Sequence, residues 1–544
     1  MEKEKLIIED IPAEKFAFAE NQDFSHDAKF DTKPVGYFKD AFRRFRKNKG
    51  SVVAGIIILI LLIFAIVVPL VSSNTAKNVR DAYYAKLGPR TTWAYNIGIN
   101  GSTKKEYNEN LLANFYGIGV AAEHKYDPET KEEHLATFEE GVKSYYQPVI
   151  KRHNQYYAQQ GAVNASMYKA NIDSYLGVGF IFKQLTYTQY MDVLSYQEKT
   201  GLQVIYPMID MYNDYYFGYD AKKGVITVEN ANYWYRASKN QFSRGAPLDK
   251  DDRVQSMVKN GGTIDFIDIY LRDETGAPVY YIRNGGGTAE TAGYKVRMLY
   301  YNYYRYLNNC EPNYILGCDS QGYDMAYRLS TGMRLSFLLA VSVSLINFII
   351  GAIYGAVEGY YGGAVDLILE RVSDILNSVP FIVVATLFQL HLAAKVGAIP
   401  SLIFAFVLTG WIGTAFRVRA QFYRFKNSEY VFAARTLGAR DARIMWKHIF
   451  PNSLGTLVTS SVLVIPGVIF SESMLSYLGI INLGTATTTS IGTLLYESST
   501  LWNIGYPNLL IIPAVVISLL MICFNLFGNG LRDAFNPTLR GSDE

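Results

Sequence analysis

The sequence has few cysteines and no strong excess of either charge. Three cysteines in 544 residues exclude a disulfide-rich framework. The 52 lysines and arginines nearly balance the 49 aspartates and glutamates, and the net charge of +3 gives no support for nucleic-acid binding. The class of protein must therefore be sought in how apolar and charged residues are distributed along the chain.

The motifs of common catalytic and nucleotide-binding sites are also missing. The sequence contains no H-E-x-x-H, C-x-x-C or G-x-S-x-G, and residues 317–322 (GCDSQG) have the wrong spacing for a nucleophile elbow. It contains no G-x-x-x-x-G-K-[ST], so this chain cannot bind ATP through a P-loop by itself. If ATP drives its work, the motor must be a separate chain.

Long apolar runs are what the sequence does have. Residues 51–71 carry no charge, and at about 1.5 Å per residue they span roughly 30 Å, the thickness of a bilayer core. The run begins some fifty residues in, too far for a secretory signal peptide, so we expect a retained transmembrane helix. We predict a mainly α-helical polytopic protein with six transmembrane helices, the other five at residues 334–357, 366–392, 399–416, 452–478 and 509–527.

Basic residues predict the orientation of these spans. A cluster at residues 43–49 precedes the first span, and eight lysines or arginines lie within residues 417–447. The positive-inside rule places both regions in the cytoplasm, and six spans bring the C-terminus back to that side. Phe38, Phe42 and Phe45 repeat at helical spacing, which predicts a short helix along the inner membrane surface. Ordinary flanking charge is the alternative explanation of the basic residues.

Between the first and second spans lies a long segment that we expect outside the cell as a folded α+β insert. It holds 33 of the 43 tyrosines and is too aromatic to stay unfolded. Residues 264–282 alternate around a turn and predict a β-hairpin, whereas residues 111–157 have a more helical composition. Exposed tyrosines favour protein or peptide contacts, although a place in the core is the commoner explanation for any single one.

These runs divide the chain into four parts. We predict a cytoplasmic N-terminal segment with an interfacial helix (1–49), transmembrane helix 1 (50–72), the extracellular insert (73–325) and a membrane core (326–544). The membrane core includes a cytoplasmic loop at residues 420–451 and a cytoplasmic tail at residues 529–544.

The loop contains a segment, residues 429–451 (EYVFAARTLGARDARIMWKHIFP), that we call the knob. Its first part has good helix formers with apolar residues on one face. Gly438 should end that helix, because glycine readily takes the left-handed conformation of a sharp helix exit. A second periodic piece follows at residues 442–449. We expect two short helices joined by a glycine turn and protruding into the cytoplasm; the alternative is an ordinary basic loop.

Polar and small residues inside the spans suit a transporter more than a receptor. Glycines at four-residue intervals in the second span allow another helix to approach closely; they are Gly351, Gly355 and Gly359. Charges in the third span either pair and face a polar interior or belong to a cytoplasmic extension; they are Glu370, Arg371 and Asp374. Glu472 lies in the fifth span, and we count Arg371, Asp374 and Glu472 as candidate pathway or interhelical polar residues.

Two of the cysteines lie in the segment placed outside the cell. We hypothesise a disulfide between Cys310 and Cys318, since that compartment is oxidising. Cys523 lies in an apolar span, where we expect a buried thiol.

The knob resembles the cytoplasmic coupling motif of permease subunits in ATP-binding-cassette importers. More narrowly, it is similar to the C-type permease of the oligopeptide/dipeptide family, with its pattern D/E-Y-V-x-A-A-R-x-L-G-A followed by H-x-x-P-N. The matching residues are Glu429, Tyr430, Val431, Ala433, Ala434, Arg435, Leu437, Gly438, Ala439, His448, Pro451 and Asn452. Other family motifs are matched at residues 316–324, 359–363, 472–479 and 525–533, and by Arg371, Asp374, Pro380 and Pro537. The resemblance covers residues 314–540 and the first span with its basic lead, roughly half of the chain.

The sequence also departs from the family pattern. Cys318 replaces a threonine, Tyr323 an arginine and Asn529 an acid. Arg440 stands where the family often has a helix-capping serine, so we assign the capping role to Asp441. A proline pair expected after the fifth span is missing, and the external segment is far longer than in the family.

The resemblance implies the fold of a type I importer permease in a bacterial cell membrane, with both termini cytoplasmic. A B-type permease would share the pathway, two ATPase subunits would bind ATP, and an extracellular lipoprotein would deliver peptide. This chain would have no ATPase site, cofactor or metal of its own. The implied coupling residues are Glu429, Tyr430, Ala433, Ala434, Arg435, Leu437, Gly438 and Ala439. For the insert we hypothesise a docking or gating platform, with an inert decoration as the alternative. Other interpretations of the chain are a nickel importer, a peptide exporter, and a membrane-anchored receptor or enzyme acting through its insert.

Overall fold

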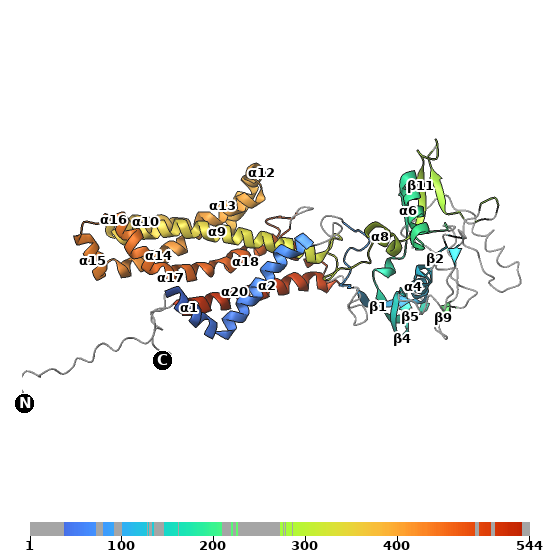
Figure 1. The fold of residues 1–544 in the computed structure, drawn as a ribbon, viewed down its shortest axis with the longest axis horizontal. Helices are drawn as coiled ribbons and strands as arrows, with labels where there is room; N and C mark the ends of the chain where they lie inside the picture. Colours follow the sequence, from blue (N-terminus) through green and yellow to red (C-terminus); the bar gives the residue numbers. More distant parts are fainter. Residues whose placement is uncertain are drawn as a thin grey trace, which may run out of the picture.

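A computed structural model gives the arrangement of most of the chain. It describes residues 37–71, 80–91, 101–123, 146–160, 163–208, 279–285, 287–484, 489–501 and 506–535, with short pieces within 125–134, 219–226 and 273–277. The described protein is elongated, with a bundle of long helices at one end and a mixed α/β part at the other (Figure 1). The helical bundle agrees with the expected mainly helical polytopic protein, whereas the division of the chain into domains stays a prediction.

The bundle contains the apolar helices that the sequence predicts. In the described part, five helices are long and apolar enough to cross a membrane, or six if one bent pair counts as a span. The single helices are α2 (Lys49–Val71), α9 (Met325–Tyr361) and α20 (Pro507–Phe535). Two further candidates run through helix pairs: α13 (Ala398–Gly410) with α14 (Ile412–Phe425), and α17 (Phe450–Val462) with α18 (Val464–Tyr477).

The predicted single helix at residues 366–392 is wrong. The chain forms α10 (Gly363–Asn377) and α11 (Phe381–His391), which meet at 71°. Pro380 explains the break, because a proline disfavours helical geometry at the residue before it and has no N–H to donate. A four-residue helix, α12 (Ala393–Val396), follows before α13.

Two helix ends also differ from the prediction. Helix α9 begins at Met325, nine residues before the expected start of the second span at Arg334, because the Asp324 side chain accepts hydrogen bonds from its first N–H groups. Helix α20 continues to Phe535, so the predicted tail at residues 529–544 begins inside a helix. The N-terminal helix α1 (Tyr37–Lys47) exists as expected, and it packs on α20 through the rings of Phe45 and Phe527.

Small residues bring α9 and α14 into close contact, as their spacing predicts. A Cβ added at Gly351, Gly355 or Gly359 would collide with backbone oxygens of Trp411, Ala415 or Arg419. These glycines are required by the approach of the two backbones.

The described insert contains two main antiparallel sheets. The first has the order β1-β5-β4, formed by β1 (Ser102–Asn108), β5 (Val163–Asp173) and β4 (Val149–Gln160). The second has the order β10-β11-β6, formed by β10 (Tyr281–Asn284), β11 (Gly293–Leu299) and β6 (Phe180–Leu185), with β7 (Ile205–Tyr206) paired to β11. Helices α4 (Glu109–Ala122), α6 (Tyr187–Thr200) and α8 (Tyr300–Asn308) pack around them. Short pairs join β2 (Lys125–Tyr126) to β3 (Glu133–His134) and β8 (Tyr219–Asp220) to β9 (Val225–Ile226).

Two predictions inside the insert fall partly outside the described residues, and the hairpin among them stays a prediction. In the described part of residues 111–157, helix α4 ends at Ala122 and Val149–Gln160 is a strand, so the expectation of a helical composition is wrong for residues 149–157. The predicted hairpin at residues 264–282 has its first arm outside the described residues, and its second arm contributes to β10, which pairs with β11.

Tyrosines form much of the described insert's core. Tyr84, Tyr175, Tyr300, Tyr304 and Tyr314 are buried in one cluster, with ring centroids commonly about 5–6 Å apart. For this group of tyrosines, the expected place in the core is therefore confirmed.

The proposed Cys310–Cys318 disulfide is wrong, since both thiols are free. Cys318 is buried in the tyrosine cluster with its Sγ 3.8 Å from the Tyr175 hydroxyl, whereas Cys310 is exposed after α8. Burial raises the pKa of the Cys318 thiol well above its usual value. Cys523 is buried in α20, as expected for a thiol in an apolar span.

Candidate coupling site and the networks that position it

The knob begins with α15 (Glu429–Thr436), and the chain leaves this helix through Leu437 and Gly438, close to the predicted end. Gly438 has φ +78°, and its N–H donates to the Arg435 carbonyl at 3.0 Å. The Ala439 N–H donates to the Ala434 carbonyl at 3.0 Å. These two bonds are those of a Schellman motif, which turns the chain sharply by placing one residue in the left-handed region. Gly438 is that residue.

The second half of the knob differs from the prediction. The chain forms α16 (Asp441–Arg443), a π-helical segment (Ile444–Ile449) and then α17 without an intervening loop. The run from Asp441 to Tyr477 counts as one 37-residue candidate span. The knob is thus one short helix, α15, joined by a tight turn directly to the end of a membrane helix. Any displacement of α15 acts on that helix through a connection of only a few residues.

An apolar cluster attaches the knob to the bundle. Val431 is fully buried, together with Ile444 and Ile449, against Tyr360 of α9 and Phe422 of α14. Burying each of these side chains contributes about 1.5–3 kcal/mol, so the cluster favours one position of α15 on the bundle.

Polar contacts tie the same region to the C-terminal end of α9. The Tyr360 hydroxyl donates to Oδ1 of Asp441 at 2.6 Å, and the Arg435 guanidinium lies 6.0 Å from the Tyr360 ring centroid. Asp441 was expected to cap the second helix, which is wrong: the N-cap is Arg440, and no side chain makes a capping bond there. Asp441 instead accepts a hydrogen bond from another helix.

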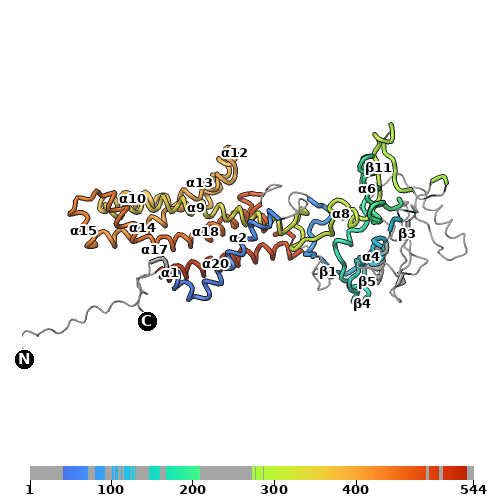
Figure 2. Tube along the Cα trace, in the orientation of Figure 1, coloured from blue at the N-terminus to red at the C-terminus, as the bar shows by residue number. Residues whose placement is uncertain are grey.

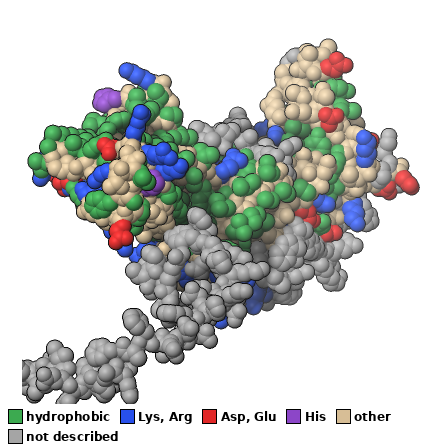
Figure 3. Space-filling view, turned by 60° about the vertical axis from the view of Figure 1, so that its left-hand side comes forward, with side chains coloured by type: hydrophobic (Ala, Val, Ile, Leu, Met, Phe, Trp, Pro, Cys, Tyr) green, Lys and Arg blue, Asp and Glu red, His purple; other side chains and the backbone are tan. Residues whose placement is uncertain are grey.

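The other candidate coupling residues form the outer face of α15. Leu437 is 88% exposed, and Glu429, Tyr430, Ala433 and Arg435 are exposed as well. Figure 3 brings this end of the bundle forward and shows lysine and arginine side chains among hydrophobic ones. An exposed leucine beside aromatic and basic side chains is the composition of a contact surface.

Close to the knob, one arginine joins three helices. Arg419 of α14 pairs with Asp366 of α10 at 2.6 Å and with Glu370 of α10 at 3.1 Å, and lies 3.7 Å from Glu358 of α9. Lys426 donates to the Gly359 carbonyl at 3.1 Å. Ion pairs hold the broken third span to its neighbours here. In contrast, close packing at Gly351, Gly355 and Gly359 holds α9 to α14.

Among the described residues, the other two charges singled out in the third span pair with each other and not with another helix. Arg371 and Asp374 pair with each other at 2.9 Å across one turn of α10, with side chains 66% and 57% exposed. A pair this exposed in the isolated chain contributes little to its stability.

Glu472 connects helices inside the bundle. Its side chain is 1% exposed and accepts hydrogen bonds from Ser336 of α9 at 2.9 Å and from Ser476 at 3.0 Å. Such bonds compensate for removing the carboxyl group from water. Glu472 therefore lies between α18 and α9 as an interhelical group.

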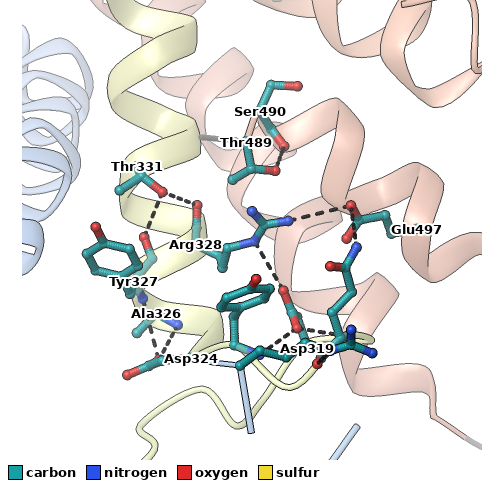
Figure 4. A network of polar contacts seen from close by, with 12 residues as sticks. Asp319, Asp324, Ala326, Tyr327, Arg328, Thr331, Thr489, Ser490 and Glu497 are labelled. Atoms are coloured by element: carbon teal, nitrogen blue, oxygen red, sulfur yellow. Dashed lines mark hydrogen bonds and ion pairs between the residues drawn. The ribbon is translucent and has the colours of Figure 1, made fainter. Parts of the chain in front are cut away.

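At the opposite end of α9 lies a second charged network, which the sequence did not predict (Figure 4). Arg328 donates to Oδ2 of Asp319 at 3.1 Å and to Oε1 of Glu497 at 3.5 Å. Glu497 belongs to α19 (Ile491–Ser499), so the network joins α9, α19 and the end of the insert. Burial raises the pKa values of Asp319 and Glu497, while Arg328 opposes that shift. Burial also raises the pKa of the N-cap Asp324 to about 6.

The same network fixes the insert to the bundle. The Asp81 N–H donates to the Gly322 carbonyl at 3.0 Å, the Lys86 N–H donates to the Asp319 carbonyl at 2.9 Å, and Arg90 and Tyr314 exchange two backbone bonds. Two segments connect the insert to the membrane helices, residues 81–90 and residues 314–324. Backbone hydrogen bonds therefore pair these segments with each other. The structure places this junction at the N-terminal end of α9 and the knob at its C-terminal end (Figures 1 and 2).

The sequence contains a signal for some of the residues that were not predicted, and none for others. Asp319 lies in a motif that the resemblance matched, and Arg328 is a charge on a helix that the sequence expected to start only at residue 334. Nothing in the sequence around Glu497 or Arg419 distinguishes them from flanking charges. Their roles depend on which helices become neighbours.

Comparisons with known proteins agree with this architecture. Residues 347–541 match the model of the binding-protein-dependent transport system inner membrane component, and residues 36–89 match the N-terminal TM domain of oligopeptide transport permease C. Neither model matches most of the insert. Among solved structures, a chain of the inward-facing MetNI methionine ABC transporter aligns with a TM-score of 0.33 at 17% identity, over 39% of this chain and 98% of that one. That likeness is too weak to assign a fold.

Curated relatives are similar over the membrane part. The dipeptide transport system permease protein DppC of Bacillus subtilis is 40% identical over 225 residues, covering 41% of this chain and 68% of that protein. The oligopeptide transport system permease protein OppC of the same organism is 37% identical, with 41% and 72% covered. DppC of Lactococcus lactis is 40% identical, with 42% of this chain and 64% of that protein covered, so the match spans less than two thirds of this relative. The chain therefore belongs to the binding-protein-dependent transport system inner membrane components, among relatives of the C-type dipeptide and oligopeptide permeases.

Proposed function

We propose that this chain is a transmembrane permease subunit of an ATP-driven peptide importer. A second permease would complete the translocation pathway, two ATPase subunits would bind the knobs of the two permeases, and an extracellular binding lipoprotein would supply peptide. The printed names of the relatives support peptide as the cargo. The coupling role rests on the geometry of the knob, since α15 exposes one face and connects through a tight turn to a membrane helix.

In this proposal the knob faces the cytoplasm and the insert faces the outside. The eight basic residues within 417–447 favour the cytoplasmic side under the positive-inside rule. A groove in the ATPase that holds α15 would move the end of α17 when ATP closes the ATPase pair, because packed helices transmit rigid-body displacement. Tyr360 would pass the same displacement to α9 through Asp441.

The insert would act as a docking or gating platform for the binding lipoprotein or for the outer face of the partner permease. Its backbone pairing with residues 314–324 and the Arg328 network support this, because they join the platform to α9 and α19. A platform attached only by a flexible linker could not influence those helices.

Reconstitution tests the coupling proposal. Ala434→Glu places a charge on α15; in liposomes containing the complete complex, we expect loss of ATP-dependent uptake of a labelled tripeptide and of peptide-stimulated ATP hydrolysis, with membrane insertion retained. Ala158→Glu on β4, at a similarly half-buried alanine, is the matched control and should leave both activities unchanged. Normal uptake by the Ala434→Glu complex would refute the coupling role. Uptake of nickel without uptake of peptide by the unmodified complex would favour the nickel importer, and ATP-dependent release of peptide would favour an exporter.

A further inference from the structure

A cavity of about 430 Å³ lies at the base of the insert, between α8 and residues 80–83. Its volume falls in the range of small-ligand sites, about 300–1,000 Å³. Helix α8 is the part of the insert near the bundle (Figure 2).

One face of α8 forms a large part of the cavity wall. Tyr300, Tyr303, Tyr304 and Leu307 line it at helical spacing. Tyr300 is held in place by Tyr83, with ring centroids 4.5 Å apart. Such walls offer broad apolar contact with hydroxyl groups at the edges, at little cost in side-chain entropy.

The charges at the cavity favour an anion. Lys183 and Arg80 both line it and are exposed. Asp81 is the one carboxylate among the lining residues, and its Oδ1 already accepts the N–H groups of Tyr83 at 3.1 Å and Tyr84 at 3.2 Å. Lys183 donates to the Tyr303 hydroxyl at 2.9 Å, so its ammonium is positioned against the aromatic wall. Two cations and one carboxylate therefore line this space, and the carboxylate is shared with the backbone N–H groups of Tyr83 and Tyr84, which leaves an excess of positive charge.

We propose that this cavity binds the C-terminal residue of a peptide, with its carboxylate at Lys183 and Arg80 and its side chain against the tyrosines of α8. An aromatic or large aliphatic terminal residue suits these walls. This inference rests on the proposed function, because it makes the insert a receptor for the importer's own cargo class.

The position of the cavity connects it to the membrane helices. Asp81 and Arg80, which line the cavity, contact the segment that precedes α9: the Asp81 N–H donates to the Gly322 carbonyl, and Arg80 Nε donates to the Gln321 carbonyl at 3.0 Å. Gln321 in turn donates to Glu497 at 3.4 Å. A bound peptide end would therefore contact Arg80, whose partner Gln321 also contacts Glu497 of α19.

Fluorescence anisotropy on the full-length chain in nanodiscs tests the proposal. The probe is Ala-Ala-Phe labelled at its N-terminus, compared with the same peptide carrying a C-terminal amide. We expect saturable binding of the acid and about tenfold weaker binding of the amide, because a charge-assisted contact is lost. Lys183→Gln should weaken binding of the acid about tenfold and leave the amide unchanged. Lys199→Gln, an exposed lysine of α6 in the same insert, is the matched control.

Several results would overturn the proposal. They are equal binding of acid and amide, unchanged affinity in Lys183→Gln, and an equal loss in Lys199→Gln. Competition by free phenylalanine as strong as by the unlabelled tripeptide would overturn the assignment to peptides. The thermal unfolding midpoint of each variant checks that it folds, and Leu307→Gln gives a second variant that alters the wall without changing charge, for which we expect weaker binding of acid and amide alike. Uptake by the complete complex is measured separately: carboxylate-dependent binding without peptide uptake would contradict the proposed function and leave the cavity assignment standing.

Discussion

Gly438 provides the sharpest test of how the knob is built. Its φ of +78° lies in the left-handed region, and a Cβ added there would have no atom within 4 Å. Alanine at this position therefore costs only backbone strain, about 1–2 kcal/mol, with no steric collision. Proline would cost more, because its fixed φ is incompatible and it removes the N–H that donates to Arg435. Asparagine tolerates the left-handed region and should cost least.

If transport requires the Schellman turn, uptake should follow this order. A strain of 1–2 kcal/mol lowers the ratio of correctly turned to otherwise folded knobs by about 5- to 30-fold. We expect uptake and peptide-stimulated ATP hydrolysis to decrease in the order glycine, asparagine, alanine, proline in complexes of equal composition. Gly413→Ala in α14 is the control, because it also has open space but no positive φ. Equal activity of Gly438→Ala and Gly438→Asn, or a loss in Gly413→Ala as large as in Gly438→Ala, would refute this reasoning.

Three further predictions concern the outer half of the chain. Arg328→Gln should lower the free energy of unfolding by about 3 kcal/mol, because it leaves Asp319 buried without its cation. Arg371→Gln should change the free energy of unfolding by about 1 kcal/mol or less. Denaturant unfolding in detergent measures both values, and equal effects would contradict the network. Burial raises the pKa of Asp324 to about 6 from an unfolded value near 3.9, so the folded chain holds this proton more firmly. The protonated group therefore contributes about 3 kcal/mol to the free energy of unfolding below pH 4, and this contribution is lost as the pH rises through 6. Asp324→Asn should remove that part of the pH dependence of the free energy of unfolding. A maleimide should label Cys310 in the folded chain without reductant and Cys318 only after unfolding, and labelling of neither before reduction would restore the disulfide.

The sequence was sufficient for features that depend on local chemistry. The charge-free run at residues 51–71 predicts a membrane helix because no other environment suits it. Gly438 predicts a helix end because other residues rarely adopt its conformation, and the spacing of Gly351, Gly355 and Gly359 predicts a close helix contact. These are properties of a few neighbouring residues.

Features that depend on distant partners were missed or misplaced. Asp441 looked like a helix cap and instead binds Tyr360, which lies 81 positions away. Cys310 and Cys318 are near in sequence, yet one thiol is buried among tyrosines and the other is exposed. The network of Arg328, Asp319 and Glu497 exists only because α19 packs beside the start of α9. The break at Pro380 could have been predicted from the sequence, because a proline in an apolar run is a local signal for a helix break.

The central claim is that the knob receives the movement of an ATP-hydrolysing partner. Leu437→Cys places a thiol on the knob at a side chain that is 88% exposed, in a chain whose exposed Cys310 is replaced by serine. In membranes containing the complete complex, a bifunctional maleimide should join this residue to an ATPase subunit, with a yield that changes when ATP is added, and Leu307→Cys in the insert should give no such product. A Leu437→Cys complex that transports peptide normally but forms no cross-link to an ATPase subunit would contradict the account.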